Sequence, residues 1–276
     1  MLNEHSEPDQ YAPPRILCLS GHDPTGGAGI QADIRAVYSL GCHPLSLITA
    51  LTCQDSHDVH AVHPQDPLVF RSQMMALIED VRVDAFKIGL VGSIELLEEI
   101  ISLLDLYPET PVILDPILAA GGGADLASDE LLHGVREWLV PKALWITPNV
   151  PEARRLTGRS DLDACARDLL EMGVSHVLLT GTHDEGPEVI NRWFGGRERL
   201  EWRWKRLPRH YHGSGCTLAA SLAAAIARGL SPRDAAMQAQ MHTYAALESG
   251  YPVGRGQWVP GFLDEQTVEK IWGSAE

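Results

Sequence analysis

The chain has 276 residues, and 22 lysines and arginines against 37 aspartates and glutamates give it a formal net charge of −15. This balance argues against a nucleic-acid-binding protein or one that docks on an anionic membrane, because both kinds of binding depend on clustered Lys and Arg. It leaves open the binding of a small polyphosphate, which a metal ion and backbone N–H groups can hold.

The first residues of the chain and its cysteine content bear on the cellular compartment in which the protein is expected. Residues 1–14 are polar and contain three prolines, and they lack the basic and apolar regions of a signal peptide. The five cysteines include no Cys-x-x-Cys pair. We therefore expect a cytoplasmic protein with free thiols, a disordered tail over 1–14 and a single domain over 15–276.

Short apolar segments alternate with amphipathic ones from residue 15 onward. A strand over 15–20 leads into a Gly-rich turn over 21–29, and residues 30–40 have the apolar spacing of a helix. The same pattern predicts strands at 45–51, 84–89, 111–115, 143–147 and 176–180 and two within 187–207, and helices at 69–78, 93–106, 126–139, 161–172, 215–228 and 231–250. This alternation predicts a mostly parallel sheet covered by helices on both faces, with ligands bound at the carboxyl ends of the strands.

The Gly-rich turn is the first candidate site. Glycine between a strand and a helix lets the backbone approach a ligand, and Asp23 in the turn offers a carboxylate to a substrate hydroxyl or amine. An ordinary strand-to-helix turn explains the glycines equally well.

Two further sites carry acidic side chains after expected strands. Asp115 ends one strand and is either a turn residue or a ligand-binding carboxylate. Asn149 and Glu152 have the spacing of a helix capping box, which the spacing alone favours over the alternative, an oxygen-rich shell for Mg²⁺.

The segment His212-Gly-Ser-Gly-Cys-Thr217 leads directly into an alanine-rich helix. Gly213, Ser214 and Gly215 would expose N–H groups at the helix N-terminus, which is a ready site for an anion. Cys216 lies in the first turn, where the helix field favours a thiolate that could act as a base. The alternative is a small buried apolar residue.

Taken together and in this order, these motifs resemble the hydroxymethylpyrimidine/phosphomethylpyrimidine kinases of thiamine biosynthesis, which belong to the ribokinase-like superfamily. The resemblance covers residues 15 to about 262. It rests on the segments SGHDPTGGAGIQADIRA (20–36), SLITALTCQ (46–54), DAFKIGLVGS (84–93), VILDPIL (112–118), ITPNVPEA (146–153) and HGSGCTLAASLAA (212–224).

The resemblance implies a ribokinase-like αβα sandwich, a homodimer, and ATP- and Mg²⁺-dependent phosphorylation of 4-amino-5-hydroxymethyl-2-methylpyrimidine and then of its monophosphate. It assigns Cys216 as the base and Gly213–Gly215 as the anion hole over the transferred phosphoryl group. The remaining assignments are pyrimidine contacts at Gly21, Asp23, Ala28, Gln54 and Leu90, nucleotide contacts at Asn149, Glu152, Thr180 and His183, and Mg²⁺ ligands at Asp115 and Glu152. Our own hypothesis adds Arg209 to the nucleotide contacts.

The chain departs from the family pattern near the nucleotide. Where the family commonly has Lys-Gly-Gly-His, this chain reads Thr180-Gly-Thr-His183, so a lysine that would contact phosphate is missing. We expect Arg206 or Arg209, in or beside an arginine-rich segment, to supply that charge.

Two alternatives remain at this point. A pyridoxal or pyridoxine kinase of the same superfamily would take a similar hydroxymethylated heteroaromatic ring, although Gln54 with Asp23 favours the aminopyrimidine. A non-catalytic ligand-binding protein on the same scaffold is disfavoured by the presence of Asp115, Glu152 and Cys216.

Overall fold

The computed structural model describes residues 12–119, 126–182, 186–196, 198–263 and 265–272. Within this part of the chain a sheet of nine strands runs in the order β3-β2-β1-β4-β5-β6-β7-β8-β9, and β10 and β11 form a separate pair. The strands are β1 (Arg15–His22), β2 (His43–Gln54), β3 (Val59–Pro64), β4 (Ala85–Ile88), β5 (Val112–Leu114), β6 (Trp145–Ile146), β7 (His176–Leu179), β8 (Glu188–Gly195), β9 (Glu198–Lys205), β10 (Tyr251–Pro252) and β11 (Trp258–Val259).

The six central strands, from β2 to β7, are parallel, and antiparallel strands extend the sheet at both edges. The central strands read as apolar runs because helices cover both of their faces. In β1, Ile16 and Cys18 face one layer of helices, and Leu17 and Leu19 face the other.

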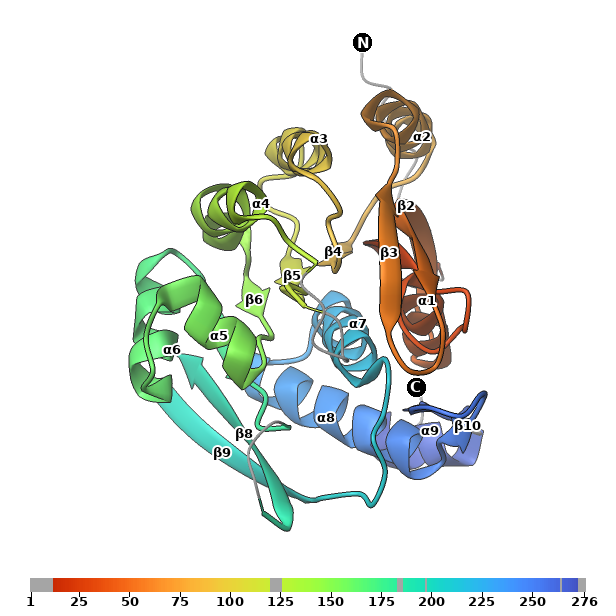
Figure 1. The fold of residues 1–276 in the computed structure, drawn as a ribbon, viewed down its shortest axis with the longest axis vertical. Coiled ribbons are helices and arrows are strands. Elements are labelled where there is room, and N and C mark those ends of the chain that lie inside the picture. The colour runs from red at the N-terminus through yellow and green to blue at the C-terminus, as the bar shows by residue number, and fades with distance from the viewer. Residues whose placement is uncertain (1–11, 120–125, 183–185, 197, 264, 273–276) are drawn as a thin grey trace.

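Helices lie on both sides of the sheet (Figure 1). The helices are α1 (Gly29–Ser39), α2 (Pro67–Asp80), α3 (Ile94–Asp105), α4 (Asp129–Gly134), α5 (Val150–Thr157), α6 (Leu162–Glu171), α7 (Ser214–Ala227), α8 (Pro232–Glu248) and α9 (Glu265–Trp272), with a π-helical turn η1 (Val135–Leu139) and a 3-10 turn η2 (Val140–Lys142).

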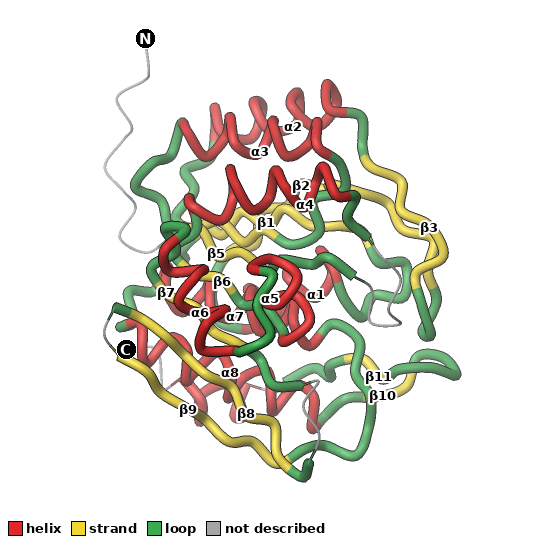
Figure 2. The backbone as a smooth tube through the Cα atoms, turned by 60° about the vertical axis from the view of Figure 1, so that its left-hand side comes forward, coloured by secondary structure: helices red, strands yellow, loops and turns green. Residues whose placement is uncertain are grey.

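Two apolar cores separate the layers. One core lies between the sheet and α2 to α6, and the other lies between the sheet and α1, α7 and α8. In Figure 2, α2 and α3 lie above the central strands of the sheet and α8 lies below them. The predicted αβα sandwich with a mostly parallel central sheet is therefore confirmed.

The strand order reverses between β1 and β4, because β2 follows β1 on one side and β4 returns to its other side. Such a switch point opens a crevice at the carboxyl ends of the strands. The Gly-rich turn follows β1 here, and Gly89 and Leu90 follow β4, so the fold brings two segments with predicted site residues to the same edge.

One predicted helix begins later than expected. The apolar spacing predicted a helix over 126–139, but α4 begins at Asp129, because the Ser128 hydroxyl accepts a hydrogen bond from the N–H of Leu131 at 3.1 Å and caps the helix. The pair of short strands β10 and β11 was not predicted, since two residues per strand leave no periodicity to detect.

No helix within the described residues is long and apolar enough to cross a membrane. The predicted disordered tail falls on residues 1–14, of which 1–11 lie outside the described residues.

Candidate active site

Asp23 organises the Gly-rich turn from inside. Its carboxylate accepts hydrogen bonds from the N–H groups of Thr25 (2.7 Å), Gly27 (3.0 Å) and Ala28 (2.7 Å) and from the hydroxyl of Thr25 (2.9 Å). Burial alone would raise the pKa of Asp23, but hydrogen bonds from His212, Gln54 and the turn lower it well below its ordinary value. The carboxylate is therefore ionised and committed to the turn, and its predicted contact with a pyrimidine stays a prediction.

His212 joins the two side chains predicted to read the pyrimidine. Its Nε2 lies 3.1 Å from Oδ2 of Asp23 and 3.4 Å from Nε2 of Gln54. The sequence analysis named His212 only as the first residue of a Gly-rich motif and assigned it no role. Its position one residue before Gly213, at the entry to α7, is the sequence feature that could have marked it as a site residue.

An apolar surface lies beside these polar groups. Ala28, Ala32 and Cys216 form a buried cluster, with Ile117 packed against it. A Cβ atom on Gly21 would lie 2.9 Å from Cδ2 of Leu90, so the glycine leaves room for the leucine. The structure therefore brings Ala28 against Cys216 and Gly21 against Leu90, and it adds Ile117, which the sequence analysis did not single out.

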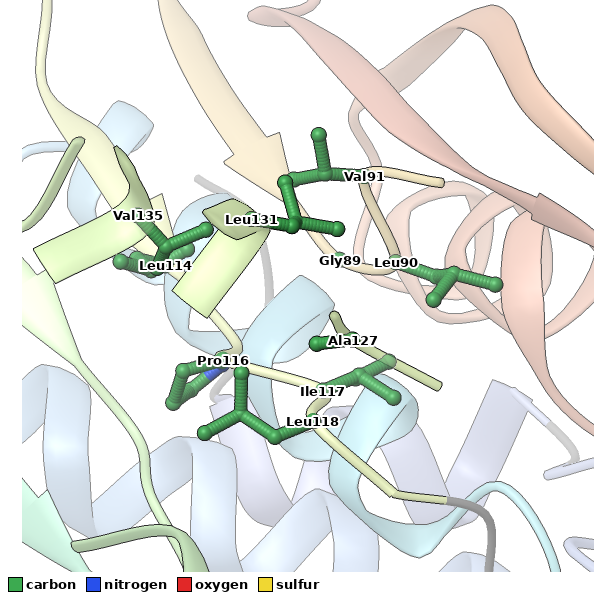
Figure 3. Close-up of a pocket in the computed structure, with 10 residues that line it drawn as sticks. All are labelled: Gly89, Leu90, Val91, Leu114, Pro116, Ile117, Leu118, Ala127, Leu131 and Val135. Carbon is green, nitrogen blue, oxygen red and sulfur yellow. The ribbon is translucent and has the colours of Figure 1, made fainter. Parts of the chain in front are cut away.

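A small apolar cavity lies at the carboxyl ends of β4 and β5 (Figure 3). It lacks hydrogen-bonding side chains, so it has no means of reading the nitrogens of a heteroaromatic ring. Leu90 and Ile117 border it, which places it next to the candidate substrate surface but apart from Asp23 and Gln54. Its lining residues are Gly89, Leu90, Val91, Leu114, Pro116, Ile117, Leu118, Ala127, Leu131 and Val135.

The first turn of α7 offers N–H groups to an anion. Gly213 precedes the helix with φ of +84°, and a Cβ at this position would lie 1.9 Å from the carbonyl oxygen of Gly27. Only glycine fits this conformation and this close approach. The N–H of Thr217 is the first to bond back into the helix, to the carbonyl of Gly213 at 3.0 Å, and the preceding N–H groups of Ser214, Gly215 and Cys216 lie in the unpaired first turn.

The thiol of Cys216 is buried, and this reverses the expected effect of the helix field. Burial raises the pKa of Cys216 to about 12, although the charge of Lys87 and the N–H of Gly29 act in the opposite direction. Burial therefore opposes the expected effect of the helix N-terminus on this thiol, and the role of Cys216 as the base stays a prediction.

Asp115 lies beside the α7 N-terminus. A Cβ on Gly215 would lie 3.7 Å from both carboxylate oxygens of Asp115, and Oδ2 is buried without a hydrogen-bond partner among the described residues. Burial raises the pKa of Asp115 to about 6, and the charge of Asp33 adds to this effect.

Glu152 forms the capping box of α5 with Asn149. The side chain of Asn149 accepts from the N–H of Glu152, and the side chain of Glu152 accepts from the N–H of Asn149, both at 2.9 Å. The interpretation that the spacing favoured is confirmed. It does not remove the carboxylate from the site, because burial and the nearby charge of Asp115 together raise the pKa of Glu152 to about 8.

Two buried carboxylates in electrostatic contact fit a divalent cation, because each is destabilised as an anion by the other. The uncommitted Oδ2 of Asp115 provides a free ligand atom. Within the described residues no group of three or more His, Cys, Asp and Glu side chains is arranged to hold a metal. A cation here would therefore complete its shell with water and phosphate oxygens, as Mg²⁺ does.

The structure brings together some of the residues that were predicted to contact the nucleotide. Thr180 pairs with Asn149 through a parallel bridge, and its N–H donates to the carbonyl of Pro148 at 3.0 Å. His183 lies outside the described residues. The strand edges beyond β6 and β7 thus bring together Asn149, Glu152 and Thr180.

The two candidate arginines have different surroundings. Arg206 donates to the backbone carbonyls of Thr182, Gly186 and Glu188 at 2.8 to 3.2 Å, so it supports the loop after β7. The guanidinium of Arg209 lies 4.9 Å from the ring centroid of Trp258. Their predicted role at phosphate stays a prediction for both residues.

Small-molecule kinases of known structure share this αβα sandwich, which is the predicted ribokinase-like fold. A solved pyridoxal kinase from Bacillus subtilis, in complex with ADP, has this fold, with a TM-score of 0.82 at 24% identity over 91% of this chain and 98% of that chain.

The sequence matches the family model described as phosphomethylpyrimidine kinase over residues 23–260. It is 38% identical over 249 residues to the hydroxymethylpyrimidine/phosphomethylpyrimidine kinase of Bacillus subtilis (strain 168), covering 88% of this chain and 92% of the relative. The solved phosphomethylpyrimidine kinase of Clostridium difficile 630 superposes with a TM-score of 0.75 at 30% identity, covering 85% of this chain and 99% of that chain. The chain belongs to the phosphomethylpyrimidine kinase family.

Proposed function

We propose that this chain, as one kinase domain in the cytoplasm and as a homodimer, uses ATP to phosphorylate 4-amino-5-hydroxymethyl-2-methylpyrimidine and then its monophosphate, in thiamine biosynthesis. The observation that carries the proposal is the position of Cys216. Its side chain packs on Ala28 at the candidate pyrimidine surface and interacts with the carboxylate of Asp115 on its other side. It therefore stands between the acceptor and the phosphate-binding side.

The backbone of α7 stabilises the transferred group. The N–H groups of Ser214, Gly215 and Cys216 point out of the helix N-terminus, where they complement negative charge that develops on phosphoryl oxygens. Because phosphoryl transfer depends mainly on positioning and electrostatic stabilisation, preorganised donors of this kind account for much of its catalysis.

Asp115 and Glu152 are the residues that would hold Mg²⁺, which would neutralise charge on the phosphates when bound. Asn149 and Thr180 lie next to Glu152 and would contact the nucleotide, together with His183 and Arg209.

Cys216 accepts the proton of the substrate hydroxyl in this proposal. Because burial raises the pKa of Cys216 to about 12, the sulfur acts as a base only once its own proton has passed to solvent. The charge of Lys87 and the N–H of Gly29 favour that ionisation.

Gln54 provides the selectivity for an aminopyrimidine. Its amide nitrogen is directed at Asp23 and His212, which leaves the carbonyl oxygen available to accept from the exocyclic amino group. Gly21, Ala28 and Leu90 supply the apolar surface for the ring.

The deciding experiment is product analysis of the purified protein with the hydroxymethylpyrimidine, ATP and Mg²⁺, by chromatography and ³¹P NMR. We expect the monophosphate first and the diphosphate later, and we expect Asp115→Asn to lose both products while it remains folded. Absence of any pyrimidine phosphate with the wild-type protein would contradict the proposal.

A pyridoxal kinase is the second candidate, because the folds of solved pyridoxal kinases superpose with TM-scores of 0.82 to 0.84. The same assay run with pyridoxal separates the two. Phosphorylation of pyridoxal with none of the pyrimidine would favour the second candidate, and phosphorylation of neither would favour a non-catalytic ligand-binding protein.

A further inference from the structure

Lys87 occupies a position where the burial of a charged side chain is energetically unfavourable. It lies in the middle of the parallel sheet, in β4, with 0% of its surface exposed, and it is the only fully buried lysine or arginine among the described residues. An ammonium transferred from water to a protein interior loses several kcal/mol of solvation unless partners compensate it. A position in an apolar strand would accept a leucine or methionine at no such cost.

Three oxygen atoms hold the ammonium in place. Nζ lies 2.8 Å from Oδ1 and 2.9 Å from Oδ2 of Asp33, in α1, and 3.1 Å from the hydroxyl of Ser20, in β1. The hydroxyl of Ser20 in turn donates to Oδ2 of Asp33 at 2.6 Å. The group therefore has one fixed position beneath the point where β1, α1 and β4 meet.

Nothing but backbone separates the ammonium from the end of β4. A Cβ on Gly89 would lie 2.8 Å from Nζ and 2.7 Å from the hydroxyl of Ser20. Gly89 is followed by Leu90, on the candidate substrate surface. Because Gly89 has no side chain, the ammonium of Lys87 can lie close to the backbone at the end of β4, next to the candidate substrate surface.

The charge of Lys87 acts on the groups of the active site. Burial would lower the pKa of Lys87, but the charges of Asp33, Cys216 and Asp115 raise it above its ordinary value, so the side chain is cationic. Lys87 in turn lowers the pKa of Cys216 and of Asp115. Asp33 and Asp115 are both buried, so this one cation acts on two buried carboxylates.

We propose that Lys87 supplies a fixed positive charge to the phosphoryl-transfer site, acting from beneath Cys216 and Asp115 without touching either substrate. It is a positioning residue for charge, and this role rests on the proposed kinase function. It stabilises the negative charge that gathers at the acceptor oxygen, and Asp33 and Ser20 serve to hold it in place. Its full burial means that it cannot replace the missing family lysine as a direct phosphate contact.

The test distinguishes the effect of the Lys87 charge on catalysis from the structural effect of the Lys87–Asp33 ion pair. Lys87→Gln keeps a donor for Asp33 and removes the charge, and Lys87→Met with Asp33→Asn removes both charges, so that Asp33 is not left as a buried carboxylate without its ion-pair partner. Asp33→Asn alone keeps the ammonium. The control is Arg71→Met with Glu99→Gln, which removes a two-bond ion pair between α2 and α3, in the other helical layer.

We expect both variants without the Lys87 charge to lose kcat by about 10- to 100-fold with KM values for both substrates within about threefold, as the loss of a nearby charge in a medium of intermediate dielectric requires. Asp33→Asn, which keeps the ammonium but weakens its hold, should lose less kcat than the uncharged variants, and the Arg71/Glu99 control should keep kcat within about fivefold of wild type. Thermal unfolding and ADP titration verify that each variant is folded and binds nucleotide, and either uncharged variant suffices if the other does not fold.

A kcat within threefold of wild type in a folded uncharged variant would overturn the proposal, as would an equal loss in Asp33→Asn, which would assign the effect to the ion pair as a structural unit. Wild-type turnover in the same series decides the proposed function independently. A wild-type protein that makes pyrimidine phosphates while the uncharged variants are equally active would leave the function intact and refute only the role of Lys87.

Discussion

The Nε2 atom of His212 lies 3.1 Å from Oδ2 of Asp23, and this contact joins two loops that are 189 residues apart in the chain. The N–H of His212 also donates to the carbonyl of Trp258 at 2.8 Å, beside β11. The same C-terminal segment holds the tip of the β2–β3 hairpin, since the N–H of Gln257 donates to the carbonyl of Ser56 at 2.7 Å. The Gly-rich turn, the hairpin that carries Gln54 and the entry to α7 are therefore linked at one point.

Replacing His212 should loosen the pyrimidine side of the site more than the phosphate side. In His212→Ala, Asp23 and Gln54 lose a shared partner, and we expect the KM for the pyrimidine to rise by about tenfold, as the loss of one hydrogen bond to a charged group implies. The KM for ATP should change little. Steady-state kinetics with each substrate varied in turn measures the split, and His210→Ala, which removes an exposed imidazole two residues away, is the control. Equal rises in both KM values would contradict the linkage.

Gly213 and Gly229 provide a matched pair for the geometry of the anion site. Their φ values are +84° and +83°, but a Cβ on Gly229 meets no atom within 4 Å, whereas one on Gly213 meets the carbonyl of Gly27. Gly229→Ala should therefore lower the free energy of unfolding by about 1–2 kcal/mol through backbone strain alone and keep full activity. Gly213→Ala should lower the free energy of unfolding by about 1–3 kcal/mol more than Gly229→Ala, because the added Cβ overpacks against Gly27. It should also lower kcat, because the first turn of α7 is displaced.

Chemical denaturation and kinetics on the two variants test this difference. If Gly213→Ala retains wild-type kcat, the orientation of this helix terminus does not matter for transfer.

The cysteines should react with alkylating reagents in an order set by burial. All five are free and lie within the described residues, and only Cys53 is exposed. Because burial raises the pKa of Cys216 to about 12, its thiolate is scarce at neutral pH, and iodoacetamide should modify Cys53 first, without loss of activity.

Mass spectrometry of the labelled protein, followed in parallel with activity, tests this order, and Cys53→Ser should abolish the rapid phase. Rapid inactivation of Cys53→Ser would show that Cys216 is far more accessible or acidic than its burial implies.

The order of elements along the chain could be predicted because buried parallel strands are continuous apolar runs and the helices between them have one apolar face. The segments around Asp23, Asp115, Glu152 and Cys216 could be placed at one edge of the sheet by the rule for strand ends. What could not be predicted is which groups face each other across that edge. The pairing of His212 with Asp23 depends on the packing of two loops, and no local spacing encodes it.

Burial is the effect that local sequence does not reveal. Position in the first turn of a helix predicted an acidic thiol at Cys216, whereas desolvation acts on its pKa in the opposite direction and depends on α1 packing over the sulfur. Lys87 was missed for a related reason. A lysine in a strand-like segment is ordinarily exposed at a sheet edge, and only the strand order, which places β4 next to β1 inside the sheet, makes it a buried cation.

Acid sensitivity of the fold should depend on His242. This histidine is buried between α8, α1 and α7, with Nε2 2.9 Å from the hydroxyl of Ser39 and Nδ1 2.8 Å from that of Ser221. Burial lowers its pKa from 6.5 to about 4, so between these two values the unfolded chain binds a proton that the folded chain does not.

Stability must therefore fall as the pH is lowered from about 6.5 to about 4, by about 3 kcal/mol in total from this group. Urea denaturation at half-unit steps of pH measures the slope, and His242→Gln should flatten it, while the exposed His43→Gln serves as the control for loss of an imidazole. A slope that is unchanged in His242→Gln would mean that groups other than this histidine control the acid response. The buried carboxylates of Asp115 and Glu152 predict the opposite sign, because a raised carboxyl pKa makes the folded chain the better proton acceptor. A slope that reverses in His242→Gln would therefore reveal their contribution.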